Sequence, residues 1–390
     1  MNNSRREAAF ALMRYLAAKE FPQKLISDGP ERAFIQEVLY VAVRRLRALR
    51  FILGKYVRKW PKGELEALLY IGAAQILFMD SIPDFAAVNE TVNAAKICSN
   101  PSVAKVVNGT LRNLIRNRAE IESLLRESPL ETRESFPTIL VKRWIKAFGE
   151  EDAARLCRLY NTPAETFLAR PDGSYTVLER GVKVSDVSGY AEGEFIVQDP
   201  ATKHAVELAN VCEGIEALDA CAAPGGKTVQ LAWRGAKVTA CEVNPRRRKV
   251  LFENIARTKI AVDVVGSFDE IPAGKKFDVV LVDAPCSNTG VFRRRPDARW
   301  NWSLEKMTQL AALQAQILEA ASKFVKPGGR LIYSTCSIED EENIFQVREF
   351  ISSHPDVAVG EMRSVLPFKT GTDGSFACEL VKKYSLLLSE

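Results

Sequence analysis

From about residue 201 onward, short apolar runs alternate with longer amphipathic stretches, and no other feature constrains the fold as strongly. Short apolar runs bounded by glycine and proline are typical of buried strands, and the stretches between them have helical spacing. Strands joined by helices favour a parallel sheet with both faces covered, which is a doubly wound α/β fold. The expected strands are 215–223, 237–242, 262–265, 277–282 and 330–335, with 357–359 and 376–388 as antiparallel edge strands; the expected helices end at 233, 257, 325 and 353.

The first third of the chain has apolar residues three and four positions apart and no strand-like alternation, which predicts a domain made only of helices. Its expected helices are 5–18, 31–53, 64–79, 88–98 and 103–117. After it, two short helices and the β-like runs 166–169, 175–178 and 195–198 indicate a small mixed domain. A length of 390 residues suits two or three domains. We therefore expect a helical domain at 1–128, a linking domain at 129–198 and an α/β domain at 199–390.

Positive charge is concentrated in the helical third: residues 1–125 hold 19 Lys and Arg against 12 Asp and Glu, whereas the remainder holds 35 against 37. Such a run is either a solvated helix face or a surface for an anionic partner such as nucleic acid. The basic residues are Arg44, Arg45, Arg47, Arg50, Lys55, Arg58, Lys59 and Lys62. A second set combines Arg293, Arg294, Arg295 and Arg299 with Trp300 and Trp302, a combination suited to stacking on unpaired bases.

Several classes of protein are disfavoured by the composition. The longest membrane-like stretch, 67–79, has 13 residues, fewer than the roughly 20 that a spanning helix needs. No secretion signal is visible at the start. The eight cysteines contain no Cys-x-x-Cys pair and only two histidines are available, so we expect no metal site and no disulfides. These features predict a soluble, cytoplasmic protein, which we expect to be monomeric.

The loop after the first α/β strand has the features of a cofactor site, because ligands bind outside the carboxyl ends of strands in this fold. Its two glycines allow backbone N–H groups to approach a ligand closely. The second strand ends at Glu242, 21 residues after the loop begins, where an acidic residue can accept hydrogen bonds from both ribose hydroxyls. This pattern leaves a nicotinamide cofactor and S-adenosylmethionine both open. The loop residues are Cys221, Ala222, Ala223, Pro224, Gly225, Gly226 and Lys227.

Two cysteines follow the ends of the next strands: Cys286 comes three residues after Asp283, and Cys336 follows the strand 330–335. Buried, inert cysteines are the more common outcome, but two of them at equivalent strand ends beside an aspartate favour chemistry. A cysteine thiolate that adds to C6 of cytosine turns the unreactive C5 into an enamine carbon able to attack a methyl sulfonium. The pair therefore indicates S-adenosylmethionine and methylation of a cytosine.

Together these motifs resemble the RNA cytosine-5 methyltransferases of the Sun/Nop family. The resemblance is carried by Cys-Ala-Ala-Pro-Gly-Gly-Lys-Thr from 221, Asp-Ala-Pro-Cys-Ser-x-Thr-Gly from 283, Arg-Arg-Arg-Pro-Asp from 293, and Ser-Thr-Cys-Ser from 334 with Glu-Glu-Asn at 341–343. The helical third resembles NusB through Val-Asn-Glu-Thr-Val from 88 and Val-Asn-Gly-Thr-Leu-Arg from 107. The combination is similar to the RsmB-like branch and implies a Rossmann-like class I methyltransferase domain, S-adenosylmethionine as cofactor and small-subunit (16S) ribosomal RNA as substrate.

The resemblance also implies a role for each motif residue. Cys336 resembles the nucleophile that adds to C6, and Cys286 the cysteine that assists elimination of the product. Asp283 resembles the carboxylate between cytosine and cofactor, and Lys227 the lysine that supports it. The loop from Cys221 to Lys227 resembles the cofactor contacts.

Two positions of the cofactor site depart from the family pattern, and in the linking domain Arg170 and Pro171 stand where the family usually has Arg-Val-Asn. Glu242 stands where the family usually has aspartate, although the longer side chain keeps both acceptor oxygens. Ser267 stands where the family has an aspartate that holds the adenine amine, and Asp269 is a possible substitute.

Three alternatives stay open. In the first, the substrate is tRNA instead of ribosomal RNA. In the second, the chain is a non-catalytic NusB-like RNA-binding assembly factor. In the third, it methylates an amino group of adenine or a protein glutamine. The last is disfavoured by Asp-Ala-Pro-Cys in place of Asn/Asp-Pro-Pro-Tyr/Phe. If the substrate is RNA, the target base has to leave its stack to reach the cysteines.

Overall fold

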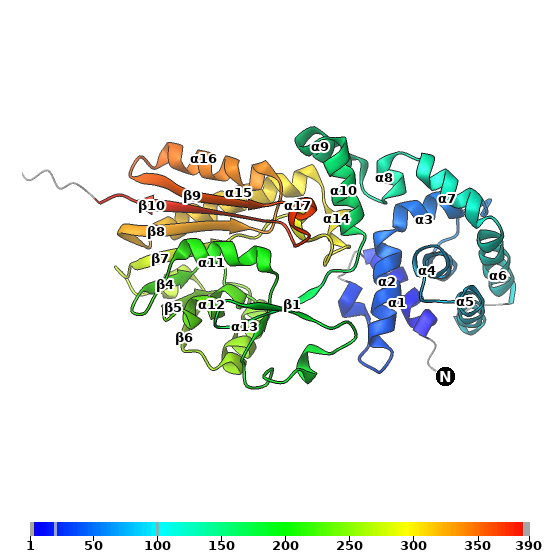
Figure 1. Cartoon of the computed structure of the whole chain (residues 1–390), viewed down its shortest axis with the longest axis horizontal. Helices are drawn as coiled ribbons and strands as arrows, with labels where there is room; N and C mark the ends of the chain where they lie inside the picture. Colours follow the sequence, from blue (N-terminus) through cyan, green and yellow to red (C-terminus); the bar gives the residue numbers. More distant parts are fainter. Residues whose placement is uncertain (1–3, 19–21, 99–100, 385–390) are drawn as a thin grey trace, which may run out of the picture. The chain divides into compact units, whose positions relative to one another are not determined.

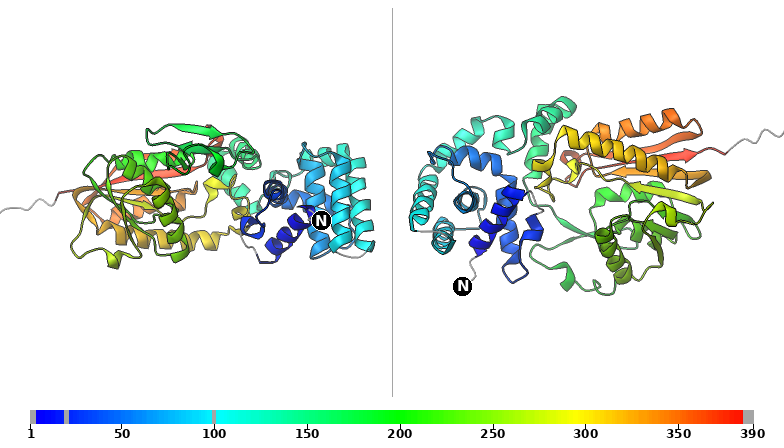
Figure 2. Two further views of the ribbon diagram at one scale, coloured as in Figure 1. Left: turned by 90° about the horizontal axis from the view of Figure 1, so that it is seen from below. Right: turned by 180° about the vertical axis from the view of Figure 1, so that it is seen from behind.

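The computed structural model describes residues 4–18, 22–98 and 101–384, which belong to two compact units (Figure 1, and from two further directions Figure 2). The first unit comprises Met1–Pro163 and the segment Phe292–Asn301, and the second comprises Ala164–Val291 and Trp302–Glu390. Our three-domain division at 128 and 198 stays a prediction. The compact units divide instead at Pro163, so the helices after 128 accompany the first unit and the short strands accompany the second. None of the helices in the described ranges is long and apolar enough to cross a membrane.

The first unit is built from helices, as its sequence pattern predicts. They are α1 (Ser4–Ala18), α2 (Arg32–Arg44), α3 (Leu46–Leu53), α4 (Glu64–Phe78), α5 (Asp84–Cys98), α6 (Pro101–Arg116), α7 (Arg118–Glu127), α8 (Leu130–Arg133), α9 (Thr138–Phe148), α10 (Glu150–Tyr160) and α14 (Ala298–Asn301), with the 3-10 turn η1 (Pro22–Leu25). Helix α4 is apolar on all sides and packs against α1, α2, α3, α5 and α6, which surround it in Figure 1. A helix without a polar face is stable only in such a central position.

The stretch 31–53, predicted as one helix, is broken at Arg45 into α2 and α3. The backbone N–H groups of Arg47 and Ala48 donate to the hydroxyl oxygen of Ser135, at 2.9 and 3.3 Å. Ser135 is fully buried and has a positive φ of 61°. A serine distant in sequence thus accepts from the free N–H groups in the first turn of α3 and stabilises the break. Local periodicity could not reveal this contact.

The second unit begins with a small antiparallel sheet in the order β2 (Tyr175–Leu178), β1 (Thr166–Ala169), β3 (Ile196–Val197). The large sheet has the order β6 (Val262–Val265), β5 (Lys237–Cys241), β4 (Glu216–Asp219), β7 (Phe277–Asp283), β8 (Val325–Thr335), β10 (Ser375–Lys382), β9 (Val357–Val365). The first five strands are parallel, and β10 is antiparallel to both of its neighbours. The predicted α/β fold is confirmed.

Helices cover both faces of the large sheet. On one face α11 (Lys203–Ala209), α12 (Gly226–Trp233) and α13 (Pro245–Thr258) cover β4, β5 and β7, with Val279 and Leu281 pointing toward that core. On the other face α15 (Leu304–Ser322) and α16 (Ile344–Ser353) pack over Val280 and Val282. Successive strand residues therefore enter opposite cores, which explains why the strands read as continuous apolar runs. Shorter elements are α17 (Pro367–Thr370) and the turns η2 (Val184–Asp186), η3 (Pro200–Thr202), η4 (Phe268–Glu270), η5 (Thr289–Val291) and η6 (Asp340–Glu342).

Several boundaries in this unit differ from the prediction; the strand expected at 215–223 ends at Asp219, and the strand expected at 357–359 runs to Val365. The helix expected to run to 325 ends at Ser322, and the Pro327-Gly328-Gly329 sequence expected as a turn lies within β8. There the pairing of β8 with β7 is interrupted between Phe277 and Val279, and Gly328 has a φ of +77°, as in a bulge. The run expected as a strand at 376–388 forms β10 up to Lys382, and its residues 385–388 lie outside the described ranges.

Candidate functional site

The predicted site residues follow three strands that lie side by side in the sheet. Strand β7 pairs in parallel with β4 on one side and with β8 on the other, so their carboxyl ends meet at one edge. The glycine-rich loop follows β4, Cys286 follows β7 and Cys336 follows β8. Topology therefore brings together three segments that are up to 115 residues apart in the chain.

The two cysteine sulfurs are neighbours, with Cys286 Sγ 3.2 Å from Cys336 Sγ. Cys286 is buried, and Cys336 is partly exposed. The hydrogen bond with Cys336 and the burial of the thiol raise the pKa of Cys286 well above its ordinary value. The side chain of Asn288 lies between the two loops: its Nδ2 donates to the carbonyl of Cys286 at 2.9 Å, and its Oδ1 is 3.4 Å from Cys336 Sγ. The sequence prediction that the cysteines meet is correct in space, and their separate roles stay predictions.

An ion pair lies at the same edge of the sheet. Lys227, in the first turn of α12, places its Nζ 2.6 Å from Oδ2 of Asp283. Burial by itself lowers the pKa of Lys227, but the charge and hydrogen bond of Asp283 outweigh it, and the pKa is raised. Oδ1 of Asp283 accepts from the hydroxyl of Ser334 at 3.3 Å. The two residues that the motifs predicted as partners are thus paired, with a cation held beside the thiols.

The glycine-rich loop is held by side chains of α13. Asn254 Nδ2 donates to the carbonyl of Pro224 at 2.8 Å, and Arg247 Nη2 donates to the carbonyl of Ala223 at 2.6 Å. Gly225 has a φ of +109°, and a Cβ atom there would lie 2.9 Å from Leu251 Cδ1. Only glycine suits this conformation and this approach. Ala222 and Ala223 are buried, and Gly226 begins α12, so the loop delivers its backbone to a helix N-terminus. Burial raises the pKa of the Cys221 thiol.

Glu242 follows β5 directly, as predicted, and its side chain is only 3% exposed. Its Oε1 accepts from the backbone N–H of Asn244 at 2.9 Å, and its Oε2 is 3.6 Å from Arg247 Nη1. The carboxylate is therefore oriented at the start of α13, and each oxygen retains a free lone pair for a further donor. Its contact with a ribose stays a prediction.

The position after β6 leaves the adenine contact undecided. Ser267 is in extended conformation and half-buried, whereas Asp269 is exposed. Glu270, which sequence reasoning did not consider, accepts from the backbone N–H of Gly266 at 2.7 Å. Ser267 as a cofactor contact stays a prediction.

Asp219 is a site residue that sequence reasoning missed. It ends β4 just before the glycine-rich loop, is 1% exposed, and accepts from the hydroxyl of Thr228 at 2.7 Å. Burial raises the pKa of Asp219 to about 6. An acidic residue that closes the first strand of an α/β domain is the signal that could have identified it.

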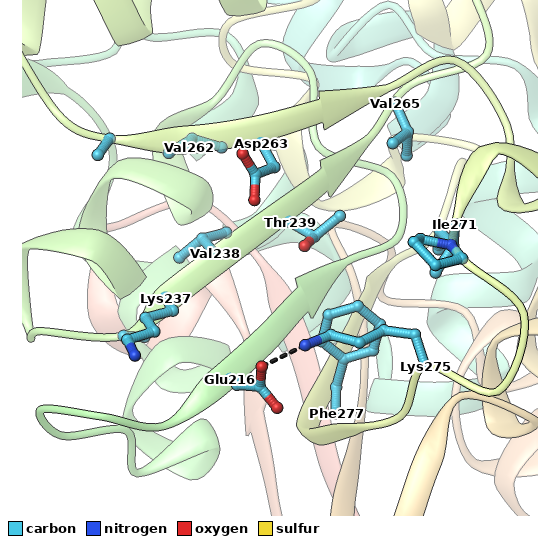
Figure 3. A pocket seen from close by; sticks show the side chains of 13 residues that line it. Glu216, Lys237, Val238, Thr239, Val262, Asp263, Val265, Ile271, Lys275 and Phe277 are labelled. Carbon is cyan, nitrogen blue, oxygen red and sulfur yellow. Dashed lines mark hydrogen bonds and ion pairs between the residues drawn. The ribbon is translucent and has the colours of Figure 1, made fainter.

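A large groove of this unit lies elsewhere, over the face of β4, β5 and β6 (Figure 3). It has a volume of 680 Å³ and is crossed by the ion pair between Glu216 and Lys275. The groove exists because the chain between β6 and β7 forms only the turn η4, and no predicted site residue lines it. Within the part of the chain that the structure describes, no cluster of His, Cys, Asp or Glu suitable for a metal ion is present.

The arginines expected to stack on RNA bases are partly structural, and this expectation is wrong for Arg299. Its side chain is fully buried in the first unit, where it donates to the carbonyl of Tyr160 and to Asn161 Oδ1, both at 3.0 Å. The ring nitrogen of Trp300 donates to the carbonyl of Val43 at 2.7 Å, and Trp302 is 8% exposed. Arg299 and Trp302 are therefore buried away from bases, whereas Trp300 is half-buried.

The first arginines of the basic helical run are structural as well. Arg44 is 6% exposed, donates to the carbonyl of Arg293, and burial lowers its pKa to about 10. Arg45 Nη1 is 3.4 Å from Glu134 Oε2, and Arg47 donates to the carbonyl of Phe136 at 2.9 Å. The expectation that the basic run contacts an anionic partner is therefore wrong for Arg44, whose side chain is buried, and stays a prediction for the half-buried Arg45 and Arg47. Within the basic run, Arg50, Lys55, Arg58, Lys59 and Lys62 stay exposed, and all of them except Arg50 lie between α3 and α4.

Comparisons with known proteins agree with both units. The family described as 16S rRNA methyltransferase RsmB/F matches residues 206–380, and the NusB family matches residues 2–116. Ribosomal RNA small subunit methyltransferase B of Serratia proteamaculans is 34% identical over 401 residues, covering 92% of this chain and 92% of the relative. Probable ribosomal RNA small subunit methyltransferase B of Bacillus subtilis is 30% identical over 408 residues, covering 90% and 91%. The crystal structure of PH0851 has the same fold, with a TM-score of 0.78 over 98% of this chain and 99% of that chain at 21% identity.

Proposed function

Because the chain belongs to the RsmB/F family of 16S rRNA methyltransferases, we propose that it transfers a methyl group from S-adenosylmethionine to C5 of a cytosine in small-subunit ribosomal RNA. The observation that supports the chemistry best is the pair of thiols 3.2 Å apart, at the ends of adjacent strands and next to the ion pair of Lys227 and Asp283. Cytosine C5 needs a nucleophile at C6 before it reacts, and a second group has to assist the release.

Exposure and charge assign different roles to the two thiols. Cys336 is the more exposed of the two, so we assign to it the addition to C6. Cys286 is buried and its pKa is raised, so it stays protonated and is the poorer attacking group. We assign to Cys286 a part in product release: a base removes the C5 proton, the bond between C6 and the Cys336 sulfur breaks with its electron pair on the sulfur, and the Cys286 thiol, 3.2 Å away, protonates that sulfur. Asp283 is assigned to the cytosine edge, where its position is held by Lys227 and Ser334.

The proposed cofactor contacts are the loop from Cys221 to Lys227, together with Glu242, Ser267 and Asp283. S-adenosylmethionine, when bound there, supplies an electrophilic methyl group. Two observations fit such a ligand. The loop approaches it with backbone alone, since Gly225 has no room for a side chain. Asp219, at the start of the loop, is buried with the hydroxyl of Thr228 as its observed side-chain donor, which leaves its carboxylate able to accept from a ligand.

The test separates the two cysteines. Cys336→Ala cannot form the bond to C6, so we expect no methylation and no protein–RNA adduct. Cys286→Ala still attacks and methylates but does not release, so we expect an adduct that survives a denaturing gel with labelled RNA and S-adenosylmethionine. Activity in both variants without any adduct would refute covalent catalysis. The reverse pattern would exchange the two roles.

The substrate is tested separately. Bisulfite sequencing of total RNA from cells without this chain should lose one 5-methylcytosine in small-subunit ribosomal RNA. Loss of a tRNA position instead would keep the chemistry and correct the substrate.

A further inference from the structure

The carboxyl group of Glu342, in the turn η6, is fully buried and takes no part in the proposed reaction. It acts as the acceptor in four hydrogen bonds. The donors to Oε1 are the backbone N–H of Ser287 at 2.7 Å and Gln314 Nε2 at 3.1 Å. The donors to Oε2 are the hydroxyl of Ser337 at 2.6 Å and the hydroxyl of Ser287.

These donors come from the two cysteine loops. Ser287 directly follows Cys286, and Ser337 directly follows Cys336. One carboxyl group is therefore shared by two segments that are 50 residues apart in the chain. The backbone of Glu342 is itself held, because the hydroxyl of Tyr333 donates to its carbonyl at 2.7 Å. The backbone of Glu342 is thus fixed to β8, and the two cysteine loops are fixed to its carboxyl group.

Buried hydrogen bonds to a carboxylate are stronger than neutral ones, and donors left without an acceptor cost their full desolvation. If Glu342 were replaced by an apolar residue, the buried hydroxyl of Ser337 and the backbone N–H of Ser287 would each lose their acceptor. The two loops would then be held to each other only by their direct hydrogen bonds, such as that from the Gly290 N–H to the Cys336 carbonyl at 3.0 Å, and we expect their thiols to move relative to each other.

We propose that Glu342 is a positioning residue that fixes the two thiols at their reactive separation by binding both cysteine loops. The functional consequence rests on the proposed cytosine methylation, but the positioning does not. The charge adds a second effect: after the Cys336 hydrogen bond and burial, Glu342 also raises the pKa of Cys286, which keeps that thiol protonated.

The separation of the thiols can be measured without RNA. In a glutathione buffer, oxidised glutathione converts the Cys286 and Cys336 thiols into one disulfide and is itself reduced to two glutathione thiols. The equilibrium ratio gives the effective concentration of the pair, and mass spectrometry of peptides identifies the bridge. Thiols that are held together have a high effective concentration, whereas thiols on loose loops have a low one.

For the full-length chain, we expect Glu342→Ala to lower this effective concentration at least tenfold. Glu342→Gln keeps one acceptor oxygen for Ser287 N–H and Gln314, and the serine hydroxyls can turn to accept from its amide, so we expect less than a threefold loss. Ser337→Ala removes the only hydrogen bond of its loop to Glu342 among those observed, whereas Ser287→Ala leaves the backbone bond. Ser337→Ala should therefore lower the value more than Ser287→Ala.

Asp340→Ala is the matched control, because Asp340 is exposed on the same turn. It should leave the effective concentration unchanged. Wild-type values in Glu342→Ala, Ser337→Ala and Ser287→Ala would overturn the inference, and so would a wild-type chain in which the disulfide never forms. The serine variants keep the test valid if Glu342→Ala does not fold.

Methylation provides the functional readout. We expect Glu342→Ala to reduce kcat at least tenfold with an unchanged KM for S-adenosylmethionine, because Glu342 does not contact the glycine-rich loop. If the wild-type chain fails to methylate RNA, the proposed function fails while the glutathione measurement still decides the role of Glu342. A loss of disulfide formation without loss of kcat would show that the separation is set by Glu342 but does not matter for catalysis.

Discussion

At the scale of single residues, the site depends on charged groups held where water does not screen them. Lys227 keeps its charge because Asp283 is 2.6 Å away. The two thiols differ in their access to solvent, because only Cys286 is buried. Asp219 is the opposite case: a carboxyl group buried at the end of β4 whose observed side-chain partner is the hydroxyl of Thr228. A neutral donor stabilises a carboxylate less than an ion pair does, so burial dominates its pKa.

A pH-dependent stability follows for Asp219. Its pKa is raised from 3.8 to about 6 in the folded chain, so the unfolded state loses this proton first as pH rises. The stabilising contribution is therefore complete below about pH 4 and is lost between about pH 4 and pH 6. At about 1.4 kcal/mol per tenfold change in proton affinity, the loss is about 3 kcal/mol. Urea unfolding at several pH values should show Asp219→Asn gaining stability relative to wild type across this window. A difference that is constant with pH would contradict the prediction.

Glu242 allows a cofactor test that preserves the local turn. Glu242→Gln keeps an acceptor for the N–H of Asn244 but replaces the other oxygen by an amide donor, so one ribose hydroxyl loses its acceptor. We expect S-adenosylmethionine to bind about tenfold more weakly, which corresponds to roughly 1.4 kcal/mol. Calorimetry measures this directly, with the exposed Asp263→Asn as control. Unchanged affinity would remove Glu242 from the cofactor site.

At the scale of elements, the segment Phe292–Asn301 is the least expected. It leaves the second unit after η5, packs within the first unit, and returns at Trp302. Its anchor is Arg299, whose guanidinium lies 3.8 Å from the ring centre of Phe136 and donates to carbonyls of the helical unit. Phe292 completes an aromatic cluster with Trp144 and Tyr160. The element is therefore part of the helical core although its neighbours in sequence belong to the other unit.

Removal of this anchor should destabilise the first unit. Burial lowers the pKa of Arg299 well below its ordinary value, and Arg299→Ala would leave the Tyr160 carbonyl and Asn161 without donors and open a cavity. We expect a loss of about 2–4 kcal/mol in unfolding free energy. Calorimetry that resolves the two units should assign the loss to the first one, and the exposed Arg348→Ala should change neither. A loss confined to the second unit would contradict the placement of the segment.

At the scale of the whole molecule, the excess of positive charge in the first third indicates a binding surface only where the charged side chains are not already paired within the protein. Arg44, Arg45, Arg47 and Arg299 have their partners within the first unit. We propose the exposed cations between α3 and α4 as a surface that meets RNA phosphates.

A salt titration tests that surface. Combined reversal of Arg58, Lys59 and Lys62 to glutamate should lower the slope of log K against log salt by about 2, because each lost phosphate contact removes roughly 0.7–0.9. Binding of S-adenosylmethionine should not change. Combined reversal of Lys323, Arg348 and Lys369, exposed in the second unit, is the matched control and should have a smaller effect. Equal effects of the two triple variants would show that the helical unit has no special part in RNA binding.

The sequence by itself determined the features that depend on local periodicity and on motifs. The helices of the first third, the strands of the α/β domain and the order of glycine loop, Asp283, Cys286 and Cys336 could all be predicted, because the hydrophobic period reports burial along each element and parallel strand ends meet at one edge. Only the tertiary structure decided the features that depend on partners distant in sequence. Ser135 accepts from the start of α3, and Glu342 binds both cysteine loops. Arg299 is buried, although the arginines and tryptophans around it in the sequence indicated an exposed RNA contact. The sequence does not show whether a charged residue or a serine is solvated or buried. The free-energy difference between the solvated and the buried side chain comes from neighbours that the chain brings together only on folding.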